Sequence, residues 1–297
     1  MANKGILYGI GAYIIWGFFP VFFKALQTVP PLQIVAHRIS GAFIFLLIVI
    51  FVRQRGTQFF KYFTQPKTLL LYSLPAILLA INWLTYVWGV NSGYVVETSL
   101  GYFINPLVNV LLGVVLLREK LRLPQWVSVG VATIGVAFLT ILAGGLPWIA
   151  LMLAFTMGFY GLLVKIGPLR ALDSLSLETG ILFIPSLVYL FFVNYQAAEP
   201  VWEQELIVLV LIGLAGVVTA TPLLLFSAAV RMIPLSTIGL LQYIAPTIQF
   251  LLGVYVYKEA FSTADLIGFC LIWIALIIYS YDSVRFQRSK TLPSPAV

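Results

Sequence analysis

The chain has 297 residues, of which 61% are hydrophobic and only 9% are charged, and its mean hydropathy is +1.04. Soluble globular domains carry roughly 25% charged residues, so this composition excludes an ordinary soluble domain and predicts that lipid is the main solvent. The formal charge of +7 is accounted for by basic cytoplasmic loops, and no nucleic-acid partner is expected.

Ten apolar runs are each long enough for a helix to cross the hydrocarbon core, which takes about 20 residues. The expected fold is therefore an all-α membrane protein with ten transmembrane helices. The runs are, in chain order, 5–26, 32–52, 68–90, 95–117, 125–142, 147–165, 175–193, 206–230, 235–257 and 264–281.

The distribution of Lys and Arg predicts the orientation. With the N-terminus inside, 14 of the 17 basic residues fall at cytoplasmic ends or loops, as the positive-inside rule requires. Only Lys24, Arg38 and Lys258 remain on the outer side. The 14 are Lys4, Arg53, Arg55, Lys61, Lys67, Arg118, Lys120, Arg122, Lys165, Arg170, Arg231, Arg285, Arg288 and Lys290. Both termini are therefore expected in the cytoplasm.

The sequence contains an internal repeat. Residues 100–119 align without gaps with residues 240–259, and eight of the 20 positions are identical. Residues 17–24 resemble residues 158–165 at nearly the same shift. The identities in the longer match include Pro106/Pro246, Gly113/Gly253 and Glu119/Glu259.

This repeat relates the first five helices to the last five. Five is an odd number, so the second half is expected to be inverted relative to the first, an architecture found in many secondary transporters. The expected organisation is a five-helix repeat at 1–142, an inverted repeat at 143–283 and a disordered cytoplasmic tail at 284–297.

Ionisable residues within or next to apolar runs each cost several kcal/mol unless they are paired or hydrated, and five of them are candidates for a functional role. His37, Arg38 and Glu97 lie toward the outer face, and Glu178 and Arg231 lie toward the inner face. We hypothesise that Arg38–Glu97 and Glu178–Arg231 are acid–base pairs that act as alternating gates, with Glu97 as a candidate proton carrier. Static pairs, or side chains that reach to water, are the alternatives.

Uncharged polar and aromatic residues near the middle of the runs are the candidate cavity lining. Such a lining, with no fixed charge at its centre, suits a neutral to zwitterionic organic molecule. For each single amide, an interhelical hydrogen bond is the alternative role. The candidates are Asn82, Trp83, Tyr86, Tyr102, Asn105, Asn109, Tyr160, Gln242, Tyr243 and Gln249.

Common catalytic signatures are missing from the sequence: it has no HExxH, no GxSxG, no Walker A motif and no Gly-rich dinucleotide turn. The single histidine, His37, cannot form a His-rich metal site. The chain is therefore expected to be no enzyme, with no catalytic residue, no metal and no cofactor.

Several short segments together resemble a known group. They are Trp16-Gly17 with Pro20 and Lys24, Ala36-His37-Arg38, Asn82-Trp83 with Asn91, Glu97 to Leu107 (ETSLGYFINPL), Gln125-Trp126, Tyr160-Gly161, Glu178-Thr179 and Gln242 to Thr247 (QYIAPT). In these segments the chain resembles the drug/metabolite transporter superfamily with paired EamA-type domains, and within it the RarD group of bacterial permeases. The chain departs from the group at Tyr257-Lys258-Glu259, where a Gly before the Glu is expected.

The resemblance implies ten helices, cytoplasmic termini, a central cavity and alternating access in the bacterial inner membrane. The expected function is secondary transport of small organic molecules, with amino-acid-like metabolites, chloramphenicol-like drugs and proton coupling as candidates. A non-transporting intramembrane enzyme or a lipid flippase-like factor is the alternative. The expected partners are a small-molecule substrate and the lipid bilayer, and monomer and homodimer both stay open.

Overall fold

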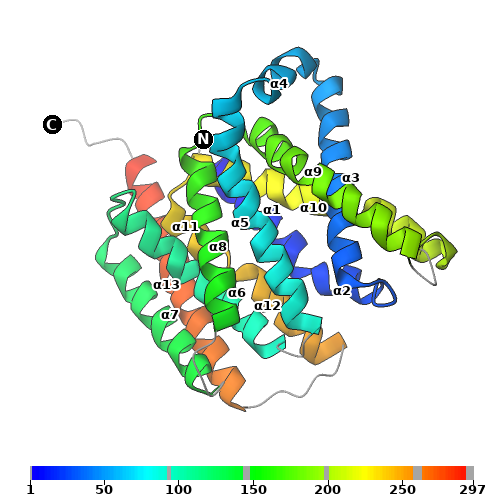
Figure 1. Ribbon diagram of the computed structural model, residues 1–297. Coiled ribbons are helices and arrows are strands. Elements are labelled where there is room, and N and C mark those ends of the chain that lie inside the picture. Colours follow the sequence, from blue (N-terminus) through cyan, green and yellow to red (C-terminus); the bar gives the residue numbers. More distant parts are fainter. Residues whose placement is uncertain (1, 92–94, 143–147, 197–200, 257–262, 292–297) are drawn as a thin grey trace.

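The computed structural model describes residues 2–91, 95–142, 148–196, 201–256 and 263–291, and the backbone alone at some of them, such as Glu97. The regular elements in these ranges are all helices (Figure 1). In chain order they are α1 (Ala2–Gly17), α2 (Phe19–Lys24), α3 (Pro31–Val52), α4 (Gly56–Phe63), α5 (Pro66–Asn91), α6 (Val95–Val115), α7 (Leu123–Leu142), α8 (Trp148–Ile166), α9 (Ala171–Gln196), η1 (Val201–Glu203), α10 (Leu206–Met232), α11 (Leu235–Leu241), α12 (Ile244–Leu251), η2 (Leu252–Val256, a π-helix) and α13 (Thr263–Thr291).

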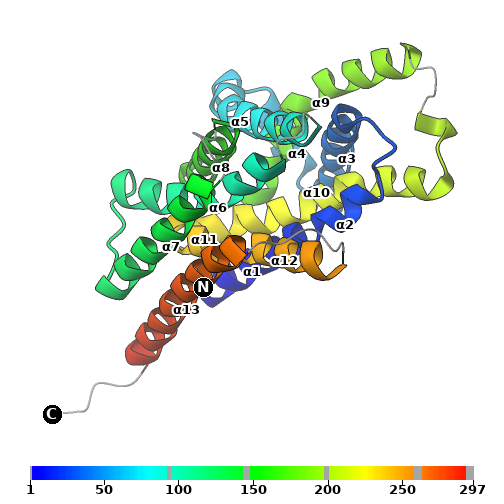
Figure 2. The ribbon, with the colours of Figure 1, turned by 90° about the horizontal axis from the view of Figure 1, so that it is seen from below.

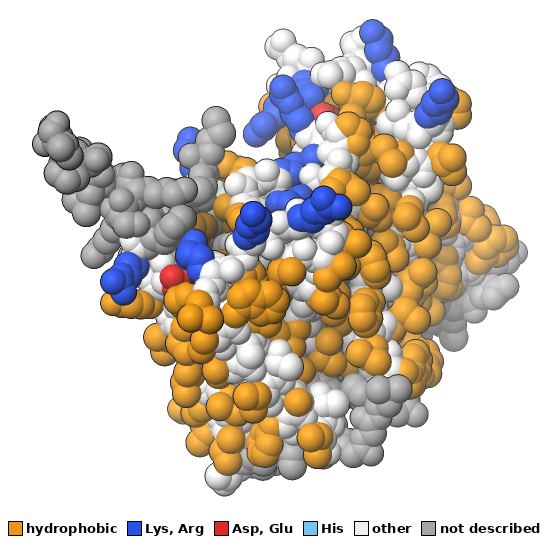
Figure 3. Space-filling model, turned by 90° about the vertical axis from the view of Figure 1, so that its left-hand side faces the viewer, with side chains coloured by type: hydrophobic (Ala, Val, Ile, Leu, Met, Phe, Trp, Pro, Cys, Tyr) orange, Lys and Arg blue, Asp and Glu red, His pale blue; other side chains and the backbone are white. Residues whose placement is uncertain are grey.

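The described ranges contain seven helical stretches that are long and apolar enough to cross a membrane, which makes this a multi-pass membrane protein. Two shorter apolar helices cover Gly101–Val115 and Leu266–Tyr279. Large hydrophobic side chains cover the face in Figure 3, and the visible Lys and Arg side chains gather above them. The seven stretches are Asn3–Lys24, Pro31–Val52, Pro66–Tyr86, Leu123–Ile141, Trp148–Ile166, Ala171–Val193 and Leu206–Met232.

The helices of the two sequence halves pack against each other rather than into two separate units. Extensive contacts join α6 to α8, α1 to α10, α3 to α10 and α7 to α13. Figures 1 and 2 both show α7 and α13 side by side at one flank of the bundle. The hydrophobic core is therefore shared between the halves.

The crossing of α3 and α10 depends on two glycines. A Cβ atom on Gly216 of α10 would lie 2.1 Å from the carbonyl carbon of Gly41 and 2.5 Å from the backbone nitrogen of Ala42, both on α3. Real Cβ atoms do not approach backbone this closely. The two helices therefore touch backbone to backbone, a packing that small residues allow in membranes.

The apolar run predicted at 235–257 is not one continuous helix. It is interrupted at Gln242 and Tyr243, between α11 and α12. The bonds Tyr243 N–H to Leu240 O and Ala245 N–H to Gln242 O, both 3.3 Å, have i→i+3 spacing. Pro246 accounts for the interruption, because it has no N–H and its ring crowds the carbonyl four residues earlier, that of Gln242.

Two differences from the sequence expectations lie on the side of α4. The helix α4 falls in a segment that was expected to be a loop, and next to it Arg55 forms a 2.8 Å ion pair with Asp173 at the start of α9. The segment expected to be a disordered tail from 284 is helical as far as Thr291. Arg122 Nε donates to Asp282 of α13 at 2.9 Å, which ties α13, just before this extension, to the start of α7.

Candidate functional site

A cavity of about 90 Å³ lies between helices of both sequence halves. Its lining residues come from the second half of α1 and α5 and from the first half of α3 and α6, so it lies away from the α4 end of the bundle. This volume is below the roughly 300–1,000 Å³ of pockets for drug-sized ligands, so this conformation suits a small molecule. The lining residues are Tyr13, Trp16, Phe19, Phe23, Arg38, Leu79, Asn82, Trp83, Tyr86, Tyr102, Met157, Leu223, Gln242, Ala245, Pro246 and Gln249.

Six of the ten residues predicted to line a cavity do so. Two of them also hold helices together: Asn82 donates to Leu153 O and Thr156 Oγ1, both at 3.0 Å, and Gln249 donates to Trp16 O at 3.1 Å. The rings of Tyr86 and Tyr102 contact each other edge to face at 5.7 Å. The six are Asn82, Trp83, Tyr86, Tyr102, Gln242 and Gln249.

Asn105 and Asn109 do not line the cavity but form a buried chain of amides. Asn109 Nδ2 donates to Gln242 Oε1 at 2.8 Å and to Asn105 Oδ1 at 3.0 Å. Asn105 Nδ2 in turn donates to Ala154 O of α8 at 3.0 Å. These amides therefore have the alternative role, interhelical hydrogen bonding, because a buried amide in a membrane needs a partner from a neighbouring helix.

The other two predicted lining residues, Tyr160 and Tyr243, are also outside the cavity. The hydroxyl of Tyr243 donates to Phe103 O at 3.3 Å. The hydroxyl of Tyr160 donates to Glu178 Oε2 at 3.0 Å, and Glu178 Oε1 accepts a 2.6 Å bond from Ser174. Both tyrosines are fully buried, since helices pack on both sides of them.

The prediction that Glu178 and Arg231 form an ion pair is wrong. Both residues are described, and the ion pairs within 4.0 Å among the described residues do not include them. Arg231 Nη1 instead donates to Gly167 O at 2.7 Å. Glu178 still interacts electrostatically with Arg231. The hydroxyls of Tyr160 and Ser174 take the place that the guanidinium was expected to fill.

Arg38 lies in the cavity wall, so the expectation of a cavity with no fixed charge is also wrong. It is 6% exposed, and its Nε donates to Thr219 Oγ1 of α10 at 2.8 Å. Its predicted partner Glu97 has a side chain outside the described residues, so this pairing stays a prediction. His37 points elsewhere: it does not line the cavity, and its Nε2 is buried without a described hydrogen-bond partner.

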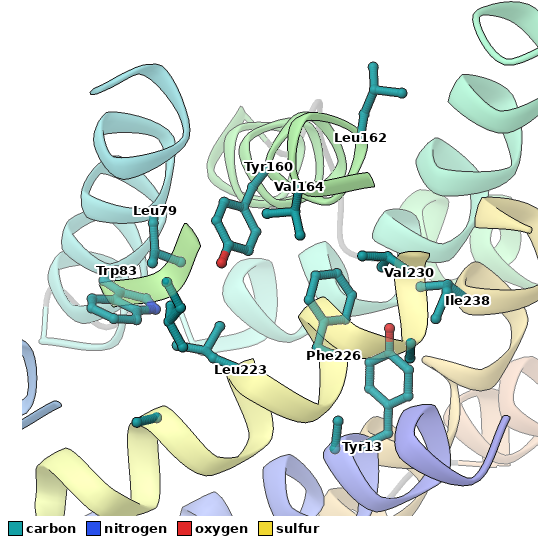
Figure 4. Close-up of a cluster of buried hydrophobic side chains, with 14 of the residues drawn as sticks. Tyr13, Leu79, Trp83, Tyr160, Leu162, Val164, Leu223, Phe226, Val230 and Ile238 are labelled. Carbon is teal, nitrogen blue, oxygen red and sulfur yellow. The ribbon is translucent and has the colours of Figure 1, made fainter. Parts of the chain in front are cut away.

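Toward the α4 end, the cavity is closed by a floor of packed side chains (Figure 4). Phe226 of α10 lies between Tyr13 and Tyr160, with ring centroids 6.4 and 6.2 Å away. Val230 and Ile238 belong to the same buried cluster. We call these five residues the cavity floor.

Below the floor, Glu119 connects the two halves. Its carboxylate accepts the N–H of Leu235 at 2.7 Å, the N–H of Ser236 at 3.0 Å and the hydroxyl of Ser236 at 2.7 Å. Arg118 has a left-handed backbone (φ 54°) and ends the turn after α6, which directs Glu119 toward the start of α11. A carboxylate suits this place because the first N–H groups of a helix are unpaired and carry partial positive charge.

The sequence profile of the EamA-like transporter family matches residues 3–141 and, a second time, residues 145–281. The chain belongs to this family. It is 41% identical to the uncharacterised transporter YojE of Bacillus subtilis over 97% of each chain. It is 40% identical to the protein RarD of Streptomyces exfoliatus over 96% of this chain and 91% of that one. A solved crystal structure with 18% identity superposes with a TM-score of 0.71 over 92% of this chain and 96% of that chain.

The chain is thus a membrane transporter, a RarD-type EamA permease. The relatives are named as transporters or as RarD and not as enzymes. In this permease, sequence reasoning missed the aromatic residues of α1 and α2, because aromatics near span ends usually anchor a helix at the membrane interface. It also missed Thr219, because a hydroxyl in a long apolar helix can equally bond to its own helix. The missed residues include Tyr13, Trp16, Phe19 and Phe23.

Replacing Glu178 of this permease by Leu should destabilise it by about 2–4 kcal/mol, because two buried hydroxyls, those of Ser174 and Tyr160, lose their acceptor. Glu178→Gln should cost clearly less, since an amide oxygen still accepts. The measurement is the apparent melting temperature of the purified protein in detergent. Equal melting temperatures for wild type and Glu178→Leu would show that this network adds no stability.

Proposed function

We propose that the permease is a secondary transporter that moves small organic molecules by alternating access between two inverted five-helix repeats, 1–142 and 143–283. The observation that carries the proposal is the cavity, which both repeats line and which the cavity floor bounds toward the α4 end. Alternating access needs such a site near the middle, between two halves that can rock.

The pattern of helix contacts supports the inversion. If the ten runs are numbered in order, the repeat exchanges run 1 with 6, 2 with 7 and so on. The contact of α6 with α8 then corresponds to that of α12 with α1, and the contact of α5 with α8 to that of α1 with α10. The double match of the family profile, once in each half, supports the same division.

The location we propose is the cell inner membrane of a bacterium, with both termini in the cytoplasm. The support is the positive-inside count and the basic rim in Figure 3. In this orientation the α4 end is cytoplasmic, and the cavity lies in the outer half of the membrane. The conformation is then closed on the inside.

Transport is tested with the purified protein in liposomes. Radiolabelled amino acids, 2-oxo acids and chloramphenicol are offered with and without an imposed pH gradient. We expect at least one of these compounds to move faster than in empty liposomes, and a response to the pH gradient would indicate proton coupling. The variant Trp83→Ala, in the cavity wall, should lower the flux about tenfold or more, because it removes contact area for the substrate.

The matched control is Trp126→Ala, since Trp126 is half-exposed on α7 and does not line the cavity. It should leave the flux unchanged. Rates equal to those of empty liposomes for every compound, with folded protein, would overturn the proposal. If Trp83→Ala and Trp126→Ala lowered the flux equally, the result would show that transport does not depend on this cavity.

A further inference from the structure

Arg38 is a cation held inside the bundle at a cost, because a buried guanidinium loses its hydration. Three aromatic rings surround it: its central carbon lies 4.9 Å from the ring centre of Phe23, 5.0 Å from that of Trp83 and 5.7 Å from that of Phe19. Ring faces attract a cation and exclude water. Together with the bond from Nε to Thr219, they hold the guanidinium in one position.

The described residues do not neutralise this charge. Among them, neither an Asp nor a Glu lines the cavity, and the ion pairs found join other residues. Nε is the nitrogen of Arg38 that bonds to Thr219, and no described residue forms a hydrogen bond with its two terminal nitrogens. Two parallel N–H groups of an arginine match the two oxygens of a carboxylate.

A second polar group of the lining also has no described partner. The hydroxyl of Tyr13 is buried, and no described residue forms a hydrogen bond with it. In Figure 4 this hydroxyl points toward Val230 and Ile238 of the cavity floor, so it does not offer a ligand contact in this conformation. The remaining wall is mainly aromatic and aliphatic.

We propose that Arg38 binds the carboxylate of the transported molecule, and that the substrate class is small organic acids with an apolar body. The carboxylate lies against the terminal nitrogens of Arg38, and the body lies on the aromatic wall formed by Trp16, Phe23 and Trp83. This inference rests on the proposed transport function and deepens it. It gives Arg38 the role of a substrate ligand in place of a gate residue.

Binding is tested first, without transport, by calorimetry on the protein in lipid nanodiscs. The probes have the same carbon skeleton: 4-methylpentanoate, leucine and the neutral 4-methylpentanamide. We expect 4-methylpentanoate to bind at least tenfold more tightly than the amide. Leucine reports whether an added ammonium group is tolerated, and leucine binding as tight as that of 4-methylpentanoate extends the class to amino acids.

The variant Arg38→Gln should lower the affinity for 4-methylpentanoate at least tenfold and leave that for the amide unchanged. Arg38→Lys, which keeps the charge but not the planar pair of donors, should fall between. Arg170→Gln is the matched control, because Arg170 is exposed and outside the cavity. Equal binding of acid and amide to the wild type, or equal losses for both in Arg38→Gln, would overturn the proposal.

Glu97→Gln distinguishes a substrate ligand from an internal ion pair. If Arg38 served only to pair with Glu97, then Glu97→Gln and Arg38→Gln would have the same effect, and each would lower the binding of the acid and of the amide alike. That result would overturn the proposal. Proteoliposome flux separates the two proposals. Arg38-dependent binding of the acid without flux refutes transport alone, and flux of the acid that Arg38→Gln leaves unchanged refutes the role of Arg38 alone.

Discussion

Replacing Glu119 by Ala is expected to raise the reactivity of residues next to the cavity floor, toward reagents on the proposed cytoplasmic side, by at least about tenfold. The carboxylate accepts three hydrogen bonds at the start of α11, and hydrogen bonds to charged groups are worth about 1.5–3 kcal/mol each. Since about 1.4 kcal/mol changes an equilibrium tenfold, losing these bonds should favour the conformation that is open on the inside.

The readout is a cysteine at a buried site of α10. Ser227→Cys is nearly isosteric and lies next to Phe226, and the native Cys270, which is exposed, is first replaced by Ser. Labelling with a membrane-impermeant maleimide from the cytoplasmic side then measures opening. Glu205→Ala is the control, because Glu205 also precedes a helix, α10, but its side chain forms no cap bond there. Unchanged labelling in Glu119→Ala would show that Glu119 does not hold the inside closed.

Gly216→Ala is expected to lower the stability of the protein by about 3 kcal/mol or more, at the upper end for added volume in packed sites. The added methyl group would meet backbone atoms of α3 at 2.1 and 2.5 Å, and backbone cannot turn away as a side chain can. The whole of α3 must move, although it carries Arg38.

The matched control lies one turn away on the same helix. A Cβ on Gly213 would meet nothing within 4 Å, so Gly213→Ala should be neutral or slightly stabilising, because Ala favours helix by up to about 1 kcal/mol over Gly. Stability is measured as the SDS fraction at which the protein unfolds from detergent micelles. If both variants unfold at the same SDS fraction, the close contact of α3 and α10 does not support the fold.

Hydropathy placed the long apolar helices, because a chain in lipid must satisfy its backbone within helices, but it missed the helix α4 and the interruption at Gln242 and Tyr243. It could not tell which neighbouring helix or cavity a polar residue would contact. Asn105 and Asn109 share a helix face with Tyr102, yet only Tyr102 reaches the cavity, because α8 and α11 cover the deeper part of α6.

The charged residues were harder still to assign from sequence. Glu178 was expected to pair with Arg231 and is held instead by the hydroxyls of Tyr160 and Ser174. Arg38, whose predicted pairing with Glu97 stays a prediction, is bonded to the hydroxyl of Thr219. A hydroxyl in an apolar helix carries no signal of its own, since it can also bond to its own helix, as Thr179 does to Leu175 O. Partners of this kind become visible only when the helices are packed.

The contact of Gly41 with Gly216 has a consequence for how the permease can move. Because α3 and α10 touch backbone to backbone at this crossing, we expect the two helices to move together. One belongs to the first repeat and the other to the second. In the transport cycle that we propose, the unit that contains α3 and α10 therefore joins helices of both repeats, and separately expressed fragments, cut between α7 and α8, would each lack one helix of this pair.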